Sequence, residues 1–242
     1  MSTIPGHAED TLKNMYVPPR VPNESARGYV VRVLRHNIVH LRLLPGTLVS
    51  ANQLSQVMGV SRTPIREAIQ ELDNTGLMKI YPQFASQVSF IDYRKIHEAN
   101  FIRMKLETAV IELACARSPD LDLDENPFEE AVQMQEYSLK SGNWTKFMEY
   151  DDAFHRQFYL LTGKMMSRQL VESVQDHFDR VRLLSIDASS CKRLVEEHRE
   201  LLEAVKRGDK TTAGAITTSH LSRYLEDEKT IRSRYRDYFV ET

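Results

Sequence analysis

The chain has 242 residues, of which 41% are apolar and 27% charged, with a formal net charge of −2. This length allows two modest domains with cores of their own, and the charge excludes a strongly basic nucleic-acid-binding protein. No apolar run approaches the roughly 20 residues of a membrane span, and no signal peptide is expected. The two cysteines have no metal-ligand spacing and suggest no disulfide framework, so we expect a cytoplasmic protein without a membrane partner.

The first elements are a tail and a helix. Residues 1–21 are polar and rich in proline, and we expect a flexible N-terminal tail. Helical periodicity follows over residues 24–40, and the Leu-Pro-Gly-Thr sequence at 44–47 indicates a turn. A mild basic bias accompanies this part of the chain, because the first 92 residues hold nine Lys/Arg against seven Asp/Glu.

Residues 50–73 predict two short helices joined by a tight turn. Leu54 and Met58 place apolar groups on one face of the first helix, and Gly59 stands where a left-handed C-cap is needed. Ser61 is a suitable N-cap for the second helix, and Pro64 falls in its first turn, where a missing N–H does no harm. This is the layout of a helix-turn-helix, whose second helix can lie in the major groove of DNA.

The outer face of the second helix presents groups that suit DNA. Arg62, Arg66 and Gln70 recur at i, i+4 and i+8, with Thr63 beside them. Arginine forks and short hydroxyls bind phosphates and guanine edges. An ordinary helical pair with solvated arginines is the alternative, but the cap, the turn and the apolar spacing agree on DNA binding. The candidate contacts on this helix are Ser61, Arg62, Thr63, Arg66 and Gln70.

The remaining chain separates into a small β-wing and a set of helices. Two extended runs at 77–81 and 87–90 predict the wing, which completes a winged helix-turn-helix domain with three helices over residues 22–91. Six amphipathic helices with short links then imply an antiparallel all-α bundle over residues 92–232. Residues 233–242 form a C-terminal tail without an assigned role. The predicted fold is therefore mainly α. The six helices are expected at 93–117, 125–141, 144–162, 165–187, 190–207 and 210–232.

Four residues of the predicted bundle have a spacing that suits one metal ion. Asp151 and His155 lie one turn apart on one helix face. His198 precedes the turn at 208–209 by about ten residues and His220 follows it by about eleven, so antiparallel packing brings both imidazoles to one height. Spacing alone leaves open that each histidine is only a hydrogen-bonding residue of the interior. Three imidazoles and a carboxylate suit Zn or Ni first, with Mn or Fe possible.

The first half of the chain resembles the GntR superfamily of bacterial transcription regulators, and the second half resembles the FCD ligand-binding domain of the FadR-type branch. The resemblance implies that Arg62, Thr63 and Arg66 contact operator DNA. It also implies that the residues at 151, 155, 198 and 220 bind a divalent metal. The motifs that carry the likeness are 44–47, 59–68 and 72–77 in the first half, and Arg103 with Leu106 and Glu107, 151–155, 197–198, 208–209 and 220–221 in the second.

This chain departs from the family at three places. Asn52 occupies a position often held by Arg, and we count it among the candidate DNA contacts. The wing tip usually carries a Gly, which is absent from residues 83–86. Lys164 follows Gly163 where the family often has Asn, and we count Lys164 as a candidate effector contact. Arg103 is a second candidate, because a guanidinium fork binds a carboxylate in bidentate fashion, although a salt bridge within the protein is equally open.

These patterns favour a homodimeric transcription regulator. It would bind a palindromic operator in double-stranded DNA and respond to a small carboxylate metabolite at a divalent metal site in the helical domain. A hydrolase-like metalloenzyme is the alternative from another class, but no nucleophile motif or phosphate loop accompanies the site, and Glu197 is the only obvious base. A purely structural metal is the third possibility.

Overall fold

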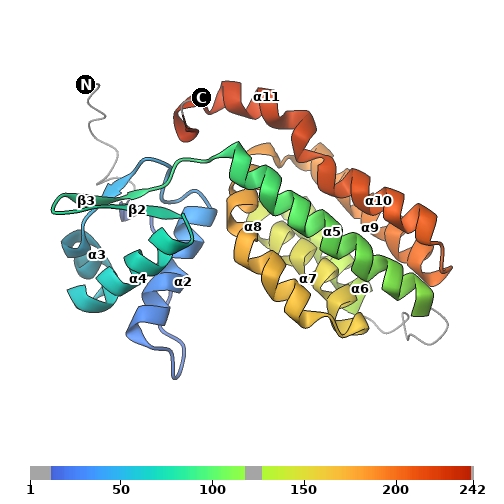
Figure 1. Ribbon diagram of the computed structural model, residues 1–242, viewed down its shortest axis with the longest axis horizontal. Coiled ribbons are helices and arrows are strands. Elements are labelled where there is room, and N and C mark those ends of the chain that lie inside the picture. Colours follow the sequence, from blue (N-terminus) through green and yellow to red (C-terminus); the bar gives the residue numbers. More distant parts are fainter. Residues whose placement is uncertain (1–11, 118–126, 241–242) are drawn as a thin grey trace. The chain divides into compact units, whose positions relative to one another are not determined.

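The computed structural model describes residues 12–117 and 127–240 (Figure 1). The chain divides into two compact units. We call residues 1–92 with 232–242 the winged-helix unit, and residues 93–231 the helical unit. Within the described ranges, no helix combines the length and the apolar character that a membrane span requires.

The winged-helix unit contains the predicted helix-turn-helix and wing, which confirms this part of the fold class. The predicted turn at 44–47 leads directly into a strand that the sequence did not indicate, where Val49 pairs with Ser86. The wing is therefore a three-stranded antiparallel sheet in the order β1-β3-β2. The elements are α2 (Ala26–Val39), β1 (Leu48–Val49), α3 (Ala51–Met58), α4 (Arg62–Asn74), β2 (Met78–Tyr81) and β3 (Ala85–Val88).

Local signals explain where α3 and α4 begin and end. Ser50 and Gln53 form a capping box at the start of α3, and Gly59 ends it with φ 65° in the left-handed region. Ser61 occupies the N-cap position of α4 as expected, but its side chain makes no capping hydrogen bond. Its hydroxyl is therefore not committed to the helix end.

Residues 12–21 are held against α2, unlike the loose tail expected there. Asn37 is fully buried, and its side-chain amide needs partners. Its Oδ1 accepts a hydrogen bond from the Tyr16 N–H at 2.7 Å, and its Nδ2 donates to the Tyr16 carbonyl at 2.8 Å. Residues 1–11 of the predicted tail lie outside the described residues.

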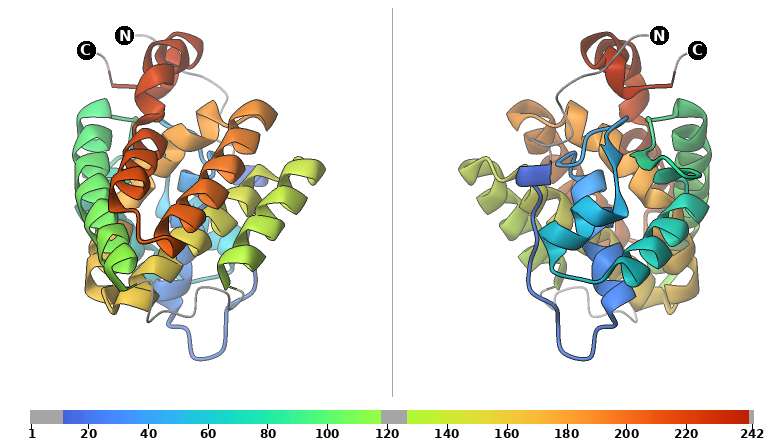
Figure 2. Two further views of the ribbon diagram at one scale, coloured as in Figure 1. Left: turned by 90° about the vertical axis from the view of Figure 1, so that its right-hand side faces the viewer. Right: turned by 90° about the vertical axis from the view of Figure 1, so that its left-hand side faces the viewer.

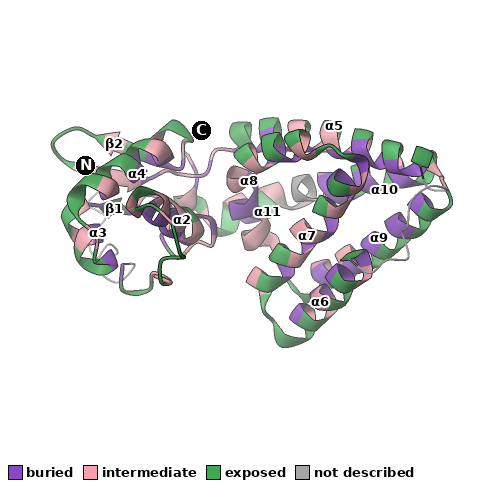
Figure 3. Ribbon diagram, turned by 90° about the horizontal axis from the view of Figure 1, so that it is seen from below, coloured by how far each residue is buried: buried purple, intermediate pink, exposed green. Residues whose placement is uncertain are grey.

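The helical unit is all-α, as predicted, with long helices packed side by side (Figure 2). Buried residues recur along one side of these helices and exposed residues along the other (Figure 3). The last predicted helix, 210–232, is two helices separated at Arg223. The helices are α5 (Tyr93–Arg117), α6 (Pro127–Ser141), α7 (Trp144–Thr162), α8 (Met165–Ser185), α9 (Ala188–Lys206), α10 (Lys210–Ser222) and α11 (Tyr224–Arg234), which continues past the end of the unit.

The residues after Ile231 rejoin the winged-helix unit. A short 3-10 helix (Arg236–Tyr238) leads into an isolated parallel bridge between Ile91 and Phe239. The Ile91 N–H donates to the Tyr238 carbonyl at 2.8 Å, and the Val240 N–H donates to the Ile91 carbonyl at 3.0 Å. Residues 238–240 of the predicted C-terminal tail are thus hydrogen-bonded to Ile91, just after the wing.

Candidate metal centre and nucleic-acid interface

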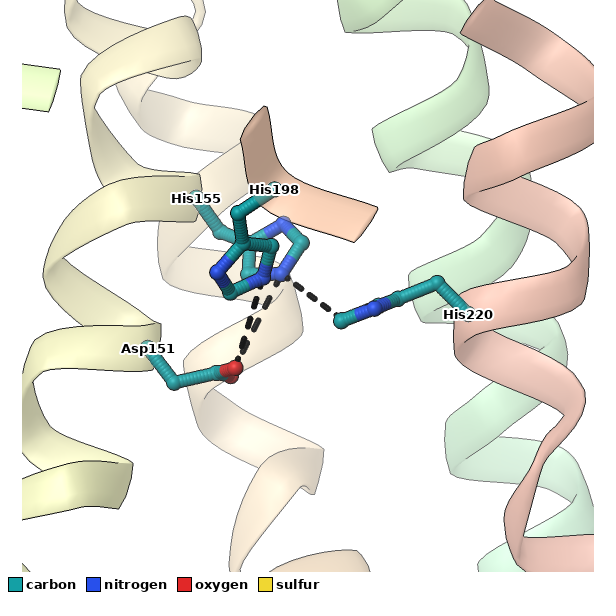
Figure 4. A group of neighbouring side chains, drawn as sticks. All are labelled: Asp151, His155, His198 and His220. Atoms are coloured by element: carbon teal, nitrogen blue, oxygen red, sulfur yellow. Dashed lines mark hydrogen bonds and ion pairs between the residues drawn. The ribbon is translucent and has the colours of Figure 1, made fainter. Parts of the chain in front are cut away.

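The structure brings all four predicted metal ligands together inside the helical unit (Figure 4). One ligand atom from each of Asp151, His155, His198 and His220 lies within 4.8 Å of the other three, and all four residues are buried. The Nε2 atoms of His155 and His220 are 3.2 Å apart, and His198 Nε2 is 3.5 Å from Asp151 Oδ1. These atoms face a common centre.

Three helices supply this cluster for the reason that the spacing suggested. Asp151 and His155 occupy successive turns of α7. The next two ligands come from α9 and α10, which are joined by the tight turn at Gly208 and Asp209 and pack against each other. Equal distances from that turn place the two imidazoles at one level.

Each histidine has its second ring nitrogen fixed by a side-chain oxygen. His155 Nδ1 lies 2.9 Å from Glu107 Oε2 without a regular hydrogen bond between them, and His220 Nδ1 is hydrogen-bonded to Glu197 Oε2 at 2.9 Å. His198 Nδ1 lies 2.8 Å from Gln135 Oε1. An oxygen at Nδ1 selects the tautomer with a proton there, so the Nε2 lone pair of each ring is available for a metal.

Burial and charge keep the ligands in the protonation states that a metal needs. Burial would raise the pKa of the Asp151 carboxyl, but the Arg182 guanidinium and the three neighbouring histidines together hold that pKa well below its usual range. Burial lowers the pKa of His220 to about 3, with the neighbouring His155 adding to the effect, and burial lowers the pKa of His198 strongly. At neutral pH the site therefore offers a carboxylate and at least these two neutral imidazoles.

A second observation, an unsatisfied buried nitrogen, also fits a divalent metal at this site. His198 Nε2 is buried and makes no hydrogen bond to any described residue. The ring stacks on Phe154 with centroids 4.1 Å apart, so its orientation is fixed by packing as well as by Gln135. A buried lone pair without a donor is unfavourable, and a cation at the common centre would satisfy it.

A small cavity adjoins the cluster and shares the His220 side chain with it. It encloses about 60 Å³, which is room for roughly four waters or a molecule of similar size. The predicted effector residue Arg103 lines it, together with two arginines that the sequence did not single out. The full lining is Arg103, Phe178, Arg182, Ser185, Ile186, Ser190, Leu194, His220, Leu221 and Arg223.

Lys164, the other predicted effector residue, does not line this cavity. It is exposed at the N-cap of α8, whereas α8 reaches the cavity through Phe178, Arg182 and Ser185. Residues 164 and 182 are about 27 Å apart along a helix, which no side chain spans. Lys164 therefore does not reach this cavity, and its role as an effector contact stays a prediction.

The predicted DNA-contacting residues all lie exposed on the helix-turn-helix. The buried side of α4 is formed by Ile65, Ala68, Ile69 and Leu72, which leaves the opposite side to the polar residues. Arg62 Nη1 donates to Asn52 Oδ1 at 3.3 Å, so α3 contributes to the same surface. The exposed residues are Asn52, Ser61, Arg62, Thr63, Arg66 and Gln70.

The wing tip turns without the glycine that its shape favours. Gln83 adopts φ 61°, the left-handed conformation that glycine takes without strain. The hairpin closes there with the Phe84 N–H donating to the Tyr81 carbonyl at 3.2 Å, and the Phe84 side chain is 75% exposed. The departure at residues 83–86 therefore leaves the hairpin intact.

Comparison with known proteins gives the family. Residues 27–88 match the bacterial regulatory proteins of the gntR family, and residues 98–223 match the FCD domain. The chain is a GntR-family transcriptional regulator with an FCD domain. Regulators of this kind bind operator DNA through the winged helix and small-molecule effectors through the FCD domain. The matched families and relatives are regulators, so the metalloenzyme interpretation is set aside.

Relatives and solved structures agree with this assignment. The transcriptional repressor RspR of Escherichia coli K12 is 30% identical over 221 residues, which span 91% of this chain and 96% of RspR. An uncharacterized regulator of Streptomyces ambofaciens is 31% identical over 211 residues, or 86% of each chain. The structure of E. coli McbR/YncC shares the fold, with a TM-score of 0.70 and 21% identity over 87% of this chain and 99% of that one.

Proposed function

We propose that this GntR-family regulator is a homodimer that binds a palindromic operator and senses a small carboxylate metabolite at a divalent metal centre in its helical unit. The observation that carries the proposal is the convergence of Asp151, His155, His198 and His220 on one point beside an arginine-lined cavity. The regulator would act in the cytoplasm, where its DNA lies.

The donor set indicates which ion the centre would hold. Three imidazole nitrogens and one carboxylate oxygen suit Zn or Ni first, and Mn or Fe are possible. Such an ion supplies a positive charge and open coordination positions for an acid. Because His220 belongs both to the cluster and to the cavity wall, a carboxylate in the cavity would lie next to the ligands.

The exposed polar residues of α3 and α4, which we call the reading surface, suit a dimer with two-fold symmetry. A single helix-turn-helix reads only a half-site, and symmetric dimers of such domains read two half-sites related by a two-fold axis. The arginines at 62 and 66 are the candidates for guanine edges and phosphates, with Asn52, Ser61, Thr63 and Gln70 beside them.

The DNA-binding part can be tested with an operator selected by the full-length protein from a random-sequence DNA library. At fixed salt, Arg66→Ala should weaken binding by about 5- to 150-fold, since a guanidinium contact to a base or phosphate is lost. Arg199→Ala, an exposed arginine of the helical unit, is the matched control. Wild-type affinity in the Arg66 variant would remove this residue from the reading surface.

The metal part can be tested by metal analysis of purified protein together with binding of carboxylic acids to metal-loaded and metal-stripped samples. Acid binding should require the metal and should change operator affinity. A folded His198→Ala, His220→Ala double variant that still responds fully to the acid would instead indicate an effector site that is independent of the metal.

A further inference from the structure

Three arginines of the cavity are each joined to a metal ligand of the cluster. The first connection runs through Glu107, whose Oε1 accepts from Arg103 Nε at 2.7 Å while its Oε2 lies 2.9 Å from His155 Nδ1. Arg103 and Glu107 are both almost fully buried. One carboxylate thus faces a cavity arginine on one side and a ligand imidazole on the other.

The second connection has the same order, and the third is direct. Glu197 accepts from Arg223 through Oε1, and its Oε2 lies 2.9 Å from His220 Nδ1. Arg182 acts on a ligand directly, because its Nη2 donates to Asp151 Oδ2 at 2.6 Å. Its Nη1 also donates to Asp179 and lies 3.5 Å from Asp152.

One of these arginines has a buried donor that no described residue satisfies. Arg103 Nη2 makes no hydrogen bond to any described residue, and the residue as a whole is only 3% exposed. A guanidinium has five N–H donors, and a buried donor without an acceptor is unfavourable. An anion that draws the Arg103 guanidinium toward the cavity would supply the acceptor.

We propose that the cavity is an anion site and that its arginines couple anion binding to the metal centre, so that a small carboxylate in the cavity tightens metal binding beyond any direct contact with the ion. This inference rests on the proposed function and adds its regulation. It assigns Arg103, Arg182 and Arg223 as positioning residues for the ligands.

The sign of the coupling follows from the order of the groups. An anion that engages Arg103 or Arg223 draws the guanidinium charge away from Glu107 or Glu197. Each glutamate then attracts the Nδ1 proton of its histidine more strongly, which makes that imidazole a better donor to a metal. Arg182 and the metal ion compete for Asp151 Oδ2. An anion that binds Arg182 therefore frees this oxygen for the metal. All three effects favour metal binding, and linkage makes the effect mutual.

The test measures the zinc affinity of the full-length protein by competition with a chromophoric chelator. Acetate, lactate, succinate and phosphate are compared with chloride at equal ionic strength and pH. At least one of the four should raise the wild-type zinc affinity about fivefold or more, which is the lower end of measured couplings between sites.

Two variants separate the arginine pathway from direct capping of the ion. Arg182→Gln should bind zinc at least as tightly as wild type without an anion, and its gain with the anion should fall to less than about twofold. Arg103→Lys keeps the charge beside Glu107 but loses the guanidinium fork, and it should also lose part of the gain. Arg199→Gln, which pairs with Glu136 on the surface, should behave as wild type.

The outcomes separate the two proposals. A full wild-type gain in folded Arg103→Lys would overturn the coupling and leave a metal-bound effector intact, as would no gain with any of the four anions in a protein that binds zinc. Should Arg182→Gln fail to fold, Arg103→Lys alone decides. A wild-type protein that binds no divalent metal would remove the proposed function itself.

Discussion

At the scale of single residues, Gln135 contacts the candidate metal centre with both ends of its amide. Its Oε1 accepts from His198 Nδ1 at 2.8 Å, and its Nε2 donates to Asp151 Oδ1 at 3.4 Å. The side chain is fully buried on α6, so neither contact exchanges with water. One neutral residue therefore orients two ligands from different helices.

Gln135→Leu should weaken zinc binding by about 10- to 100-fold, because an unsupported imidazole loses its orientation and part of its donor strength. The measurement is chelator competition on the full-length protein. Gln133→Leu changes an exposed glutamine of the same helix and serves as the matched control. Equal affinities in the two variants would show that the amide does not support the ligands.

The lowered pKa values of the buried histidines predict how acid acts on the metal-free protein. His220 has a folded pKa of about 3, and that of His198 is also far below the ordinary 6.5, so between pH 6.5 and about 3 the unfolded chain binds protons that the native site does not. Burial and the nearby Asp152 raise the pKa of Asp179 to about 7. In this pH range the native protein therefore holds a proton on Asp179 that the unfolded chain has released, which offsets one of the two histidine protons.

The unfolded chain thus binds about one proton more than the native protein. The free energy of unfolding of the metal-free protein should therefore fall by about 1 kcal/mol from pH 6 to pH 5. Urea unfolding can follow it through Trp144, the single tryptophan, which begins α7. In His220→Asn the slope should be close to zero. A metal-free wild type that gains stability on acidification would contradict this assignment.

At the scale of elements, two glycines at turns of the winged-helix unit differ in what a larger residue would cost. At one, only the backbone would be strained, and at the other a side chain would also clash. Gly59 ends α3 with φ 65°, and an added Cβ would meet nothing within 4 Å. Gly46 precedes β1 with φ 82°, and a Cβ there would lie 2.9 Å from the Phe90 ring. The two positions share a left-handed backbone but differ in the space around it.

Gly59→Ala should therefore destabilise the winged-helix unit by about 1 kcal/mol, the cost of a non-glycine residue in this conformation. Gly46→Ala should cost about 2–4 kcal/mol, because Phe90 must also shift. Hydrogen exchange of α3 and α4 amides gives both values. A larger effect at Gly59 than at Gly46 would contradict this ranking.

The sequence predicted most elements because their signals are local. Caps, a glycine turn and apolar periodicity placed α3 and α4, and the breaks between the long helices placed the bundle. The strand β1 has only two residues and owes its existence to pairing with β3, which lies far away in sequence. The break between α10 and α11 at Arg223 was likewise missed, because the residues on both sides of it are helical.

The four candidate ligands were predictable for the same reason, since Asp151 and His155 share a helix and His198 and His220 flank one turn. Their supporting residues were not. Gln135 and Arg182 reach the site from other helices. Their roles depend on how the helices pack, and the spacing of residues along the sequence does not indicate them. Lys164, which likeness to a motif position suggested as an effector contact, stays a prediction that this cavity does not support.

At the scale of the whole molecule, a metal at this centre would bind three separate helices of the helical unit. Zinc should slow hydrogen exchange in α7, α9 and α10 and leave α3 and α4 unchanged. At a thousandfold excess over the dissociation constant, the stabilisation should approach about 4 kcal/mol. Uniform protection of both units would indicate that zinc acts elsewhere.

The bridge between Ile91 and Phe239 has a consequence for protein engineering. The peptide segment that ends the chain belongs with the winged-helix unit, so the helical unit is in effect inserted into it. Chimeras that exchange sensors between relatives need two junctions, one near Asp92 and one near Ile231. A single fusion point would leave a foreign C-terminal segment bonded to Ile91 of the native winged-helix unit. A deletion of that segment would remove contacts from the DNA-binding unit and none of the four candidate metal ligands.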